Sequence, residues 1–407
     1  MRPRLKTAVR TLTGEERLFG AALAVMALQM LTAAAVTGQV MLALTFVALA
    51  PAAFLAFQRS GRAVRVLLAG PLGLAAVASG FAHHVPRLVL GSPQADDYTG
   101  ALFGLAGAAL VGLTFHVALR GRGRLAKLLA VPVVLALAQW FLLPTVTAGL
   151  ATNAHRSHVE SAASLALPGA RDVSFPAADG TRLRGWYVPG KRTPAVILLH
   201  GSHGTRVATL AHLRTLAAAG FPVLAFDARG HGQSGGRANA LGWRGADEIA
   251  GAFQFLRHQP GVDRTQIAVL GLSMGAEEAL RAASEGVPLA GIVADGAGAS
   301  TTGDQRLVEG SAVPTSVSWL TMRAVELFSG DREPAPLTSV VERVSAPTLL
   351  IASNATGEEA IARRLQRRMG GRSELWYVPD AGHTKALDAH PAAYRARVVG
   401  FLDQLSS

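Results

Sequence analysis

The stretch Ile267–Gly275, IAVLGLSMG, decides the fold, because an apolar run ends there at a serine flanked by glycines. The run predicts a strand, and the amphipathic stretch Gly275–Glu285 after it predicts a helix. A serine hydroxyl is a weak nucleophile, so it needs exposure on a sharp turn and an adjacent base. The glycines leave space beside Ser273, and the start of the helix favours negative charge that develops there. Ser273 is therefore the candidate nucleophile.

The segments around this stretch alternate between strand-like and helix-like patterns. Asp179-Gly180 is a hairpin turn signal between two strand-like segments, Arg171–Pro176 and Arg182–Val188. Further apolar runs lie at Ala195–His200, Val223–Asp227, Ile267–Leu272, Gly291–Asp295, Thr348–Ala352 and Leu375–Val378. Strands that are apolar throughout and joined by helices form parallel sheets covered on both faces. The sequence therefore predicts an α/β fold with a mostly parallel sheet and an N-terminal hairpin.

Two more segments are expected at the sheet edge that carries Ser273. His383 lies in the loop PDAGHT, directly after Leu375–Val378. A histidine at the carboxyl end of a strand can reach a nucleophile on the same edge, so His383 is the candidate general base. The glycine-rich segment HGSHG follows an earlier strand. The backbone amides of Ser202, in that segment, and Met274 are the predicted oxyanion donors.

Four motifs in this order resemble the α/β-hydrolase superfamily, and most closely its serine aminopeptidase-like and esterase-like branch. They are the His-Gly loop, the segment FDARGHGQS at Phe226–Ser234, the serine turn and Gly382-His383. The resemblance covers about Arg171 to Leu405. It implies a doubly wound sheet, a Ser-His-acid triad and no cofactor, and no metal site is predicted. In such proteins the Asp227 loop is structural, so Asp227 is not assigned to the triad.

The triad acid departs from the family pattern. In the family it commonly follows the strand that corresponds to Thr348–Ala352, often as an aspartate, but the sequence here is SNATGEE. Glutamate is an accepted third member of a triad, and Glu359 is preferred. Glu358 is an alternative, because either glutamate can also be a first-turn helix residue. Asp295 is the other alternative, since it ends the strand that follows the nucleophile.

A long insertion separates two of the predicted strands, at about residues 297–346. Long insertions in compact folds are usually lids or binding loops, so we expect a small cap with an amphipathic helix at Ser316–Phe328. Glu277 and Glu278, just after the serine turn, are most simply first-turn helix residues. The alternative is that they recognise the amine of a substrate.

The N-terminal part of the chain reads as a membrane region. Hydrophobic residues make up 50% of the chain and charged residues only 16%. Five apolar stretches have about the 20 residues needed to cross a bilayer: Leu18–Thr37, Val40–Phe57, Val64–Ala82, Ala101–Leu119 and Leu128–Ala148. Basic residues collect in the N-terminal arm and in alternate bridges, as the positive-inside rule requires. An odd number of crossings places the hydrolase domain outside the cytoplasm.

The same basic residues explain the formal charge of +12, and no nucleic-acid motif accompanies them. The chain contains no cysteine, which excludes disulfides and a thiol nucleophile. His83, His84 and His116 lie in or near the spans with no evident carboxylate partner. Paired charges inside the spans are also not evident, which disfavours a transporter.

The expected organisation is a basic arm at 1–17, a transmembrane region at 18–150, a linker at 151–170 and a hydrolase domain at 171–407. The expected function is a membrane-anchored serine hydrolase that cleaves a small-molecule or lipid-derived ester through an acyl-serine intermediate. One alternative keeps the fold and makes the protein an aminopeptidase. The other is a non-catalytic membrane sensor or interaction protein, which an absent triad acid would favour.

Overall fold

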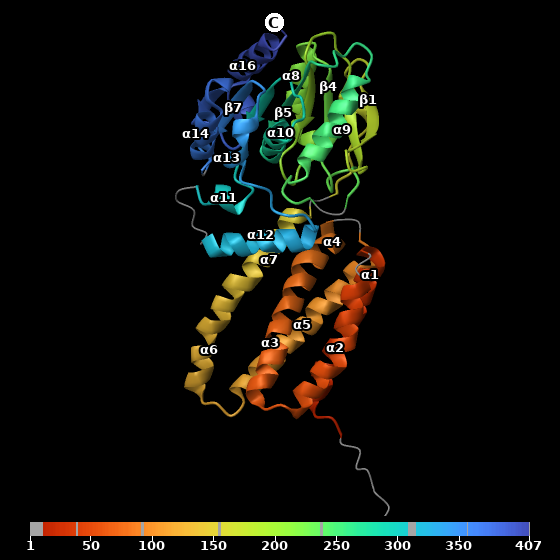
Figure 1. The fold of residues 1–407 in the computed structure, drawn as a ribbon, viewed down its shortest axis with the longest axis vertical. Coiled ribbons are helices and arrows are strands. Elements are labelled where there is room, and N and C mark those ends of the chain that lie inside the picture. The colour runs from red at the N-terminus through yellow and green to blue at the C-terminus, as the bar shows by residue number, and fades with distance from the viewer. Residues whose placement is uncertain are drawn as a thin grey trace, which may run out of the picture. The chain divides into compact units, whose positions relative to one another are not determined.

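The computed structural model describes residues 11–37, 40–90, 93–153, 156–236, 239–307, 315–355 and 357–406. The chain separates into two compact units, Met1–Val146 and Thr147–Ser407. The first unit is helical and the second contains the sheet (Figure 1). The boundary lies within a few residues of the predicted end of the transmembrane region.

The five helical stretches that the sequence predicts lie in the first unit, except that the last one runs across the boundary at Val146. They are α1 (Gly14–Thr37), α2 (Val40–Arg59), α3 (Arg62–Ser79) continued through a π-turn into α4 (Val85–Leu90), α5 (Ala95–Leu119), and α6 (Arg124–Leu137) continued through a second π-turn into α7 (Leu143–Thr152). The two residues between the first two predicted spans, Gly38 and Gln39, and most of the basic arm lie outside the described residues. Within the described ranges, four helices are long and apolar enough to cross a membrane: Gly14–Val36, Arg62–Val89, Ala95–Leu119 and Arg124–Thr152. The apolar segment Ala43–Arg59 is shorter.

Small residues let α3 and α5 approach closely. A Cβ on Gly80 would lie 2.4 Å from the backbone of Gly104, and a Cβ on Gly107 would lie 2.7 Å from the Gly73 carbonyl oxygen. Such glycine contacts are typical of helix pairs in membranes, where close van der Waals packing replaces the hydrophobic effect. The sequence and the packing therefore agree on the same class of helical unit.

The expectation that the imidazoles lack carboxylate partners is wrong for His84. His84 Nδ1 lies 3.0 Å from Asp97 Oδ1, and both side chains are buried. Gln29 Nε2 lies 3.0 Å from His84 Nε2, and Thr99 donates to Gln29 Oε1. Arg87 also lies 3.8 Å from Asp97. These groups come from α1, the second half of the α3–α4 helix and α5, so sequence spacing alone does not reveal the pairing.

The second unit is built on one mixed sheet. Its strands are β1 (Arg171–Pro176), β2 (Arg182–Val188), β3 (Ala195–Leu199), β4 (Val223–Asp227), β5 (Ile267–Leu272), β6 (Ile292–Asp295), β7 (Thr348–Ser353) and β8 (Ser373–Val378). Among the described residues the strand order is β1-β2-β4-β3-β5-β6-β7-β8. The β1–β2 and β2–β4 pairs are antiparallel, and all others are parallel. The predicted sheet with its N-terminal hairpin is confirmed.

Helices cover both faces of this sheet (Figure 1). The helices are α8 (Leu210–Ala218), α9 (Gly245–Arg257), α10 (Met274–Ser284), α14 (Glu358–Met369), α15 (Ala386–Ala389) and α16 (Pro391–Gln404). Successive strand side chains point to opposite faces, so Ile197 packs in one core with α9, α10 and α14. Leu198 packs in the other core with α8 and α16. This is the doubly wound arrangement expected from the apolar strands.

Of the predicted linker at 151–170, the part from residue 156 on is instead packed in the second unit, and residues 154 and 155 lie outside the described part. Val159, Ala162 and Leu165 are buried in the core cluster that includes Trp186. The Trp186 indole donates to the Glu160 carbonyl oxygen at 3.1 Å. The short apolar residues of this stretch cover the outer face of β2, which the Ala/Ser-rich composition did not reveal.

The insertion after β6 contains α11 (Thr302–Gln305), α12 (Thr315–Ser329) and α13 (Leu337–Val340), with residues 308–314 outside the described part. The predicted helix at Ser316–Phe328 is therefore confirmed as α12. The buried Asp304 carboxylate accepts hydrogen bonds from Leu337 N at 2.7 Å and from Thr338 N at 3.1 Å. Asp304 therefore ties the two ends of the insertion together.

Candidate active site

Ser273 lies on the turn between β5 and α10, where its backbone takes φ 52° and ψ −113°. A positive φ is strained for a residue with a side chain and is characteristic of nucleophile turns. A Cβ on Gly271 would lie 2.2 Å from the Gly275 carbonyl oxygen, and a Cβ on Gly275 would lie 2.5 Å from the Leu199 Cβ. The two glycines therefore permit the turn to pack against β3.

His383 lies within hydrogen-bond distance of both Ser273 and a carboxylate. Its Nε2 is 2.8 Å from Ser273 Oγ, and its Nδ1 is 2.7 Å from Glu358 Oε2. Because an ionised carboxylate only accepts, the Nδ1–H donates to Glu358 and leaves Nε2 to accept the serine proton. This is the hydrogen-bond order of a serine hydrolase triad.

Glu358 is fixed at the end of β7. Its Oε1 accepts from Ser353 N at 2.6 Å, and its Oε2 accepts from Ser353 Oγ at 3.1 Å. Gly357 precedes it with φ 76°, which turns the chain into α14. The side chain is only 4% exposed, so its orientation is set by these bonds.

The preference for Glu359 as the acid is corrected by the structure. The Glu359 side chain is 38% exposed and accepts from Arg363 Nε at 2.7 Å, one helical turn later. Consecutive residues of a helix point about 100° apart, so only the first of the two glutamates faces the strand ends. Asp295 is buried at the end of β6, and in the described part of the chain its Oδ2 has no hydrogen-bond partner.

The predicted oxyanion donors lie beside the candidate nucleophile. A Cβ on Gly201 would lie 3.1 Å from the Ser273 Cβ, so the segment before Ser202 passes directly over the serine. Met274 is the first residue of α10, where backbone N–H groups have no acceptor within the helix. Gly201, which precedes Ser202, and Met274, which follows Ser273, therefore lie next to the candidate nucleophile, and the oxyanion role of the two amides stays a prediction.

Comparison with known proteins identifies the family of the second unit. The profile of the serine aminopeptidase S33 family matches residues 190–344. An uncharacterized protein of Mycobacterium tuberculosis, Rv2307c, is 31% identical over 226 residues, covering 54% of this chain and 75% of the relative. The chain belongs to the serine aminopeptidase S33 family of α/β-hydrolases. It is therefore a member of a hydrolase family.

Two further proteins are similar to this S33 family member over most of their own length. The uncharacterized protein YfhR of Escherichia coli O157:H7 is 28% identical over 246 residues, covering 57% of this chain and 80% of the relative. An esterase of Pyrococcus furiosus, Pf2001, has 27% sequence identity and a TM-score of 0.51, covering 63% of this chain and 98% of the esterase. These matches concern the hydrolase fold.

The electrostatics of this S33 site favour a basic imidazole at His383. The hydrogen bond to Glu358 is the largest cause that raises the pKa of His383 above its usual 6.5, and partial burial opposes it. Burial raises the pKa of Asp295 to about 7, with the charge of Glu358 as the next cause. The two carboxyl groups near the imidazole therefore have different environments. Glu358 is hydrogen-bonded to Ser353 and His383, whereas burial is the main influence on the pKa of Asp295.

Two other histidines in the glycine-rich loops, His200 and His231, are structural. His200 accepts from Ala228 N at 2.9 Å and contacts the Gly201 carbonyl oxygen at 2.7 Å. Burial lowers the pKa of His200 to about 4 and that of His231 to about 3, so both remain neutral. These imidazoles therefore shape the loops around the serine.

Asp227 also has the structural environment expected for it. Its carboxylate accepts from Arg206 N at 2.8 Å, from Gln233 N at 2.9 Å and from the Arg206 guanidinium at 2.5 Å. Asp227 therefore joins β4 to the two loops that flank it.

The two glutamates after the serine turn are buried in α10. Glu277 accepts from Ser300 N at 3.2 Å, and burial raises its pKa. Burial followed by the charge of Glu248 raises the pKa of Glu278 well above its usual value, and neither Glu278 oxygen has a partner among the described residues. Neither glutamate presents an exposed carboxylate to a substrate amine.

Proposed function

We propose that this protein is a membrane-anchored serine hydrolase that cleaves carboxylic esters through an acyl-serine intermediate. The observation that carries the proposal is the continuous hydrogen-bond chain Ser273–His383–Glu358, with distances of 2.8 Å and 2.7 Å. A nucleophile and base in hydrogen-bond contact, with the base oriented by a third group, is the geometric signature of nucleophilic catalysis.

In the proposed reaction Ser273 Oγ attacks the ester carbonyl carbon while its proton moves to His383 Nε2. Glu358 stabilises the resulting imidazolium through Nδ1–H. The backbone amides of Ser202 and Met274 donate to the tetrahedral oxyanion. The C–O bond then breaks, the departing alkoxide takes the proton from Nε2, and water repeats the sequence on the acyl-serine.

Two observations favour an ester over an aminoacyl amide. The similarity to the Pyrococcus furiosus esterase extends over 98% of that protein. In addition, Glu277 and Glu278 are buried among protein groups, so neither supplies an anionic partner for a free α-amine. The family name alone does not fix the substrate, because one fold hosts many reactions.

The non-catalytic alternative loses its main support. It drew on the missing aspartate after β7, but a buried carboxylate from Glu358 lies 2.7 Å from the imidazole. A binding module would not need the Glu358 carboxylate in contact with a histidine that is hydrogen-bonded to a serine.

The proposed location is the cell membrane, with the hydrolase domain outside the cytoplasm. The length and apolarity of four helices support membrane insertion, and α2 with 20 residues supplies a fifth crossing. A membrane location suits a substrate class of lipid-derived or other acyl esters.

Hydrolysis of two matched substrate series by the purified full chain tests the proposal. One series contains p-nitrophenyl esters of increasing acyl length, and the other contains aminoacyl p-nitroanilides. We expect turnover of esters that is lost in Ser273→Ala, whose side chain lacks only the hydroxyl. Turnover of the anilides alone would make the protein an aminopeptidase, and no turnover of either by folded protein would favour the binding module.

A further inference from the structure

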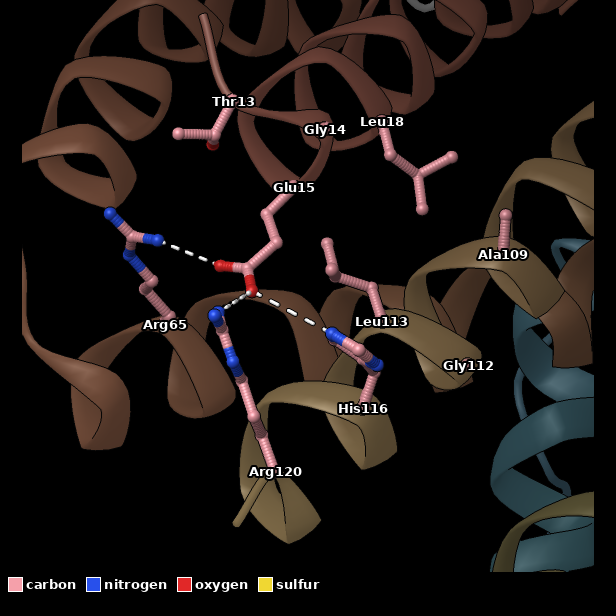
Figure 2. Close-up of a pocket in the computed structure, with 10 residues that line it drawn as sticks. All are labelled: Thr13, Gly14, Glu15, Leu18, Arg65, Ala109, Gly112, Leu113, His116 and Arg120. Atoms are coloured by element: carbon pink, nitrogen blue, oxygen red, sulfur yellow. Dashed lines mark hydrogen bonds and ion pairs between the residues drawn. The ribbon is translucent and has the colours of Figure 1, made fainter.

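The helical unit contains a pocket of about 720 Å³ between the start of α1, the start of α3 and the end of α5. Figure 2 shows Leu18, Ala109 and Leu113 on one side of it, with Arg65, His116 and Arg120 converging from the other. The pocket therefore has an apolar wall and a basic rim.

Glu15 organises the basic rim. The Arg65 guanidinium donates to Glu15 Oε2 at 2.8 Å, and the Arg120 guanidinium donates to Glu15 Oε1 at 3.2 Å. His116 Nε2 lies 3.9 Å from the same Oε1. A guanidinium carries five N–H donors, so one carboxylate oxygen leaves most of those of Arg120 available.

The exposure of these side chains distinguishes an inner from an outer cation. The Arg65 side chain is 18% exposed and also lies 3.9 Å from the buried Glu16. The Arg120 and His116 side chains are 68% and 63% exposed. Arg65 is therefore a mostly buried cation paired with the two glutamates, whereas the side chains of Arg120 and His116 are exposed at the pocket.

The surroundings of the pocket are strongly basic. The ends of the helices that meet here carry eight basic residues against the two glutamates: Arg17, Arg59, Arg62, Arg65, Arg120, Arg122, Arg124 and Lys127. Their formal sum is therefore 8 − 2 = +6. Figure 1 shows that the α2–α3 and α5–α6 connections lie at the same end of the unit. Basic pockets between membrane helices at such an end suit anionic lipid headgroups.

We propose that this pocket binds an anionic phospholipid of the surrounding bilayer. Its phosphate accepts hydrogen bonds from Arg120 and His116 at the rim. One acyl chain lies against Leu18, Ala109 and Leu113. The proposal rests on the membrane location proposed above, but not on the hydrolase reaction.

Gly112 provides a direct test, because a Cβ built on this residue meets no atom within 4 Å. It lines the pocket from α5, so Gly112→Leu adds a branched apolar side chain on the pocket wall, and the first atom of that side chain has room. Ala24→Leu adds bulk at an exposed position of α1 outside the pocket and is the matched control. Arg120→Gln removes the rim charge, and Arg124→Gln removes an equal charge that does not line the pocket.

The full chain in detergent micelles is titrated with dioctanoyl phosphatidylglycerol, and bound lipid is counted by native mass spectrometry. Dioctanoyl phosphatidylcholine tests headgroup charge, and inorganic phosphate added as competitor tests the need for an acyl chain. We expect one retained phosphatidylglycerol, no competition by phosphate, and loss of the adduct in Gly112→Leu. Arg120→Gln should weaken binding about fivefold, the value of one basic side chain at an anionic surface.

Ala24→Leu should bind like the wild type, and Arg124→Gln, whose side chain does not line the pocket, should weaken binding less than Arg120→Gln. Equal retention of phosphatidylcholine, displacement by phosphate, or unchanged binding in Gly112→Leu would overturn the proposal. Membrane fractionation and thermal melting of each variant tell a failure of the pocket from a failure of membrane location or folding.

Discussion

At Glu358 and Glu359, one step along α14 decides which carboxylate meets the imidazole. Glu358 is the first residue of the helix and accepts from the Ser353 backbone, whereas Glu359 points to solvent and pairs with Arg363. Since both residues are glutamates in the first helical turn, sequence pattern does not separate them. The glycine at 357 with its positive φ sets the helix start and hence the choice.

The exchange Glu358→Gln should lower kcat by up to about 10⁴-fold, because the imidazole loses the partner that fixes its tautomer and stabilises its charged form. Glu359→Gln is the matched control, and it should retain activity because its side chain pairs only with surface groups. Ester hydrolysis measured on both variants checks the assignment. Equal losses, or a loss confined to Glu359→Gln, would contradict it.

The pH dependence of kcat/KM provides a second check at the same residue. The base must be neutral to accept a proton, and the hydrogen bond to Glu358 raises the pKa of His383 above 6.5. Activity should therefore rise with pH through an apparent pKa above 6.5 and fall as the pH drops below it. In Glu358→Gln the residual activity should show this acid limb at lower pH, and a limb at unchanged pH would contradict the proposed coupling.

Ser273 and His383 were predictable because each lies in a motif with a defined strand before it. The acid was not, because two carboxylates are adjacent and a third ends the neighbouring strand. The His84–Asp97 pair was missed for a different reason: its two residues lie on either side of a helix break, in segments that read as a span end and a polar bridge. Tertiary contacts between such segments leave no periodic signal.

Among the elements, the turn between β5 and α10 depends most on residue size. Gly271→Ala would place a Cβ 2.2 Å from a backbone oxygen of Gly275, which cannot move without opening the turn. We expect the free energy of unfolding to fall by about 1–3 kcal/mol or more. Activity should fall as well, because Ser273 shifts from the imidazole.

Gly400→Ala is the control for this substitution. Gly400 lies in α16, and a Cβ there meets no atom within 4 Å. Alanine should therefore stabilise the helix by about 0.8–1.0 kcal/mol relative to glycine. Thermal melting and ester turnover are measured for both variants. If Gly271→Ala changed neither stability nor turnover, the turn would tolerate a side chain and the prediction would be wrong.

The strands were predictable to within two residues, since β3 to β8 each contain an apolar run between turn residues and β1 and β2 flank the turn signal Asp179-Gly180. The segment 151–170 was not, because its buried residues are few and separated by exposed ones. Val159, Ala162 and Leu165 follow helix-like spacing over less than two turns. A pattern so short does not distinguish a packed segment from a linker.

For the whole molecule, the absence of cysteine allows topology to be measured without background labelling. Ala393→Cys introduces a thiol at an exposed position of α16, and Gly123→Cys introduces one between α5 and α6. With five crossings, a membrane-impermeant maleimide should label Ala393→Cys in right-side-out vesicles. It should label Gly123→Cys only after permeabilisation.

The reversed labelling pattern would mean a cytoplasmic hydrolase domain, which an even number of crossings from a cytoplasmic N-terminus would give. Labelling of both thiols in sealed vesicles would contradict membrane insertion of α6 and its neighbours. The charge pattern favours five crossings with the hydrolase domain outside the cytoplasm, since basic residues concentrate at one end of the helical unit.

Labelling of the full chain with a fluorophosphonate tests the central claim most directly. The reagent phosphonylates a serine hydroxyl only when a neighbouring base activates it. We expect one phosphonyl group on the wild type, located at Ser273 by peptide mass spectrometry, and none on Ser273→Ala. Folded wild-type protein that stays unlabelled, or a label on another serine, would contradict it.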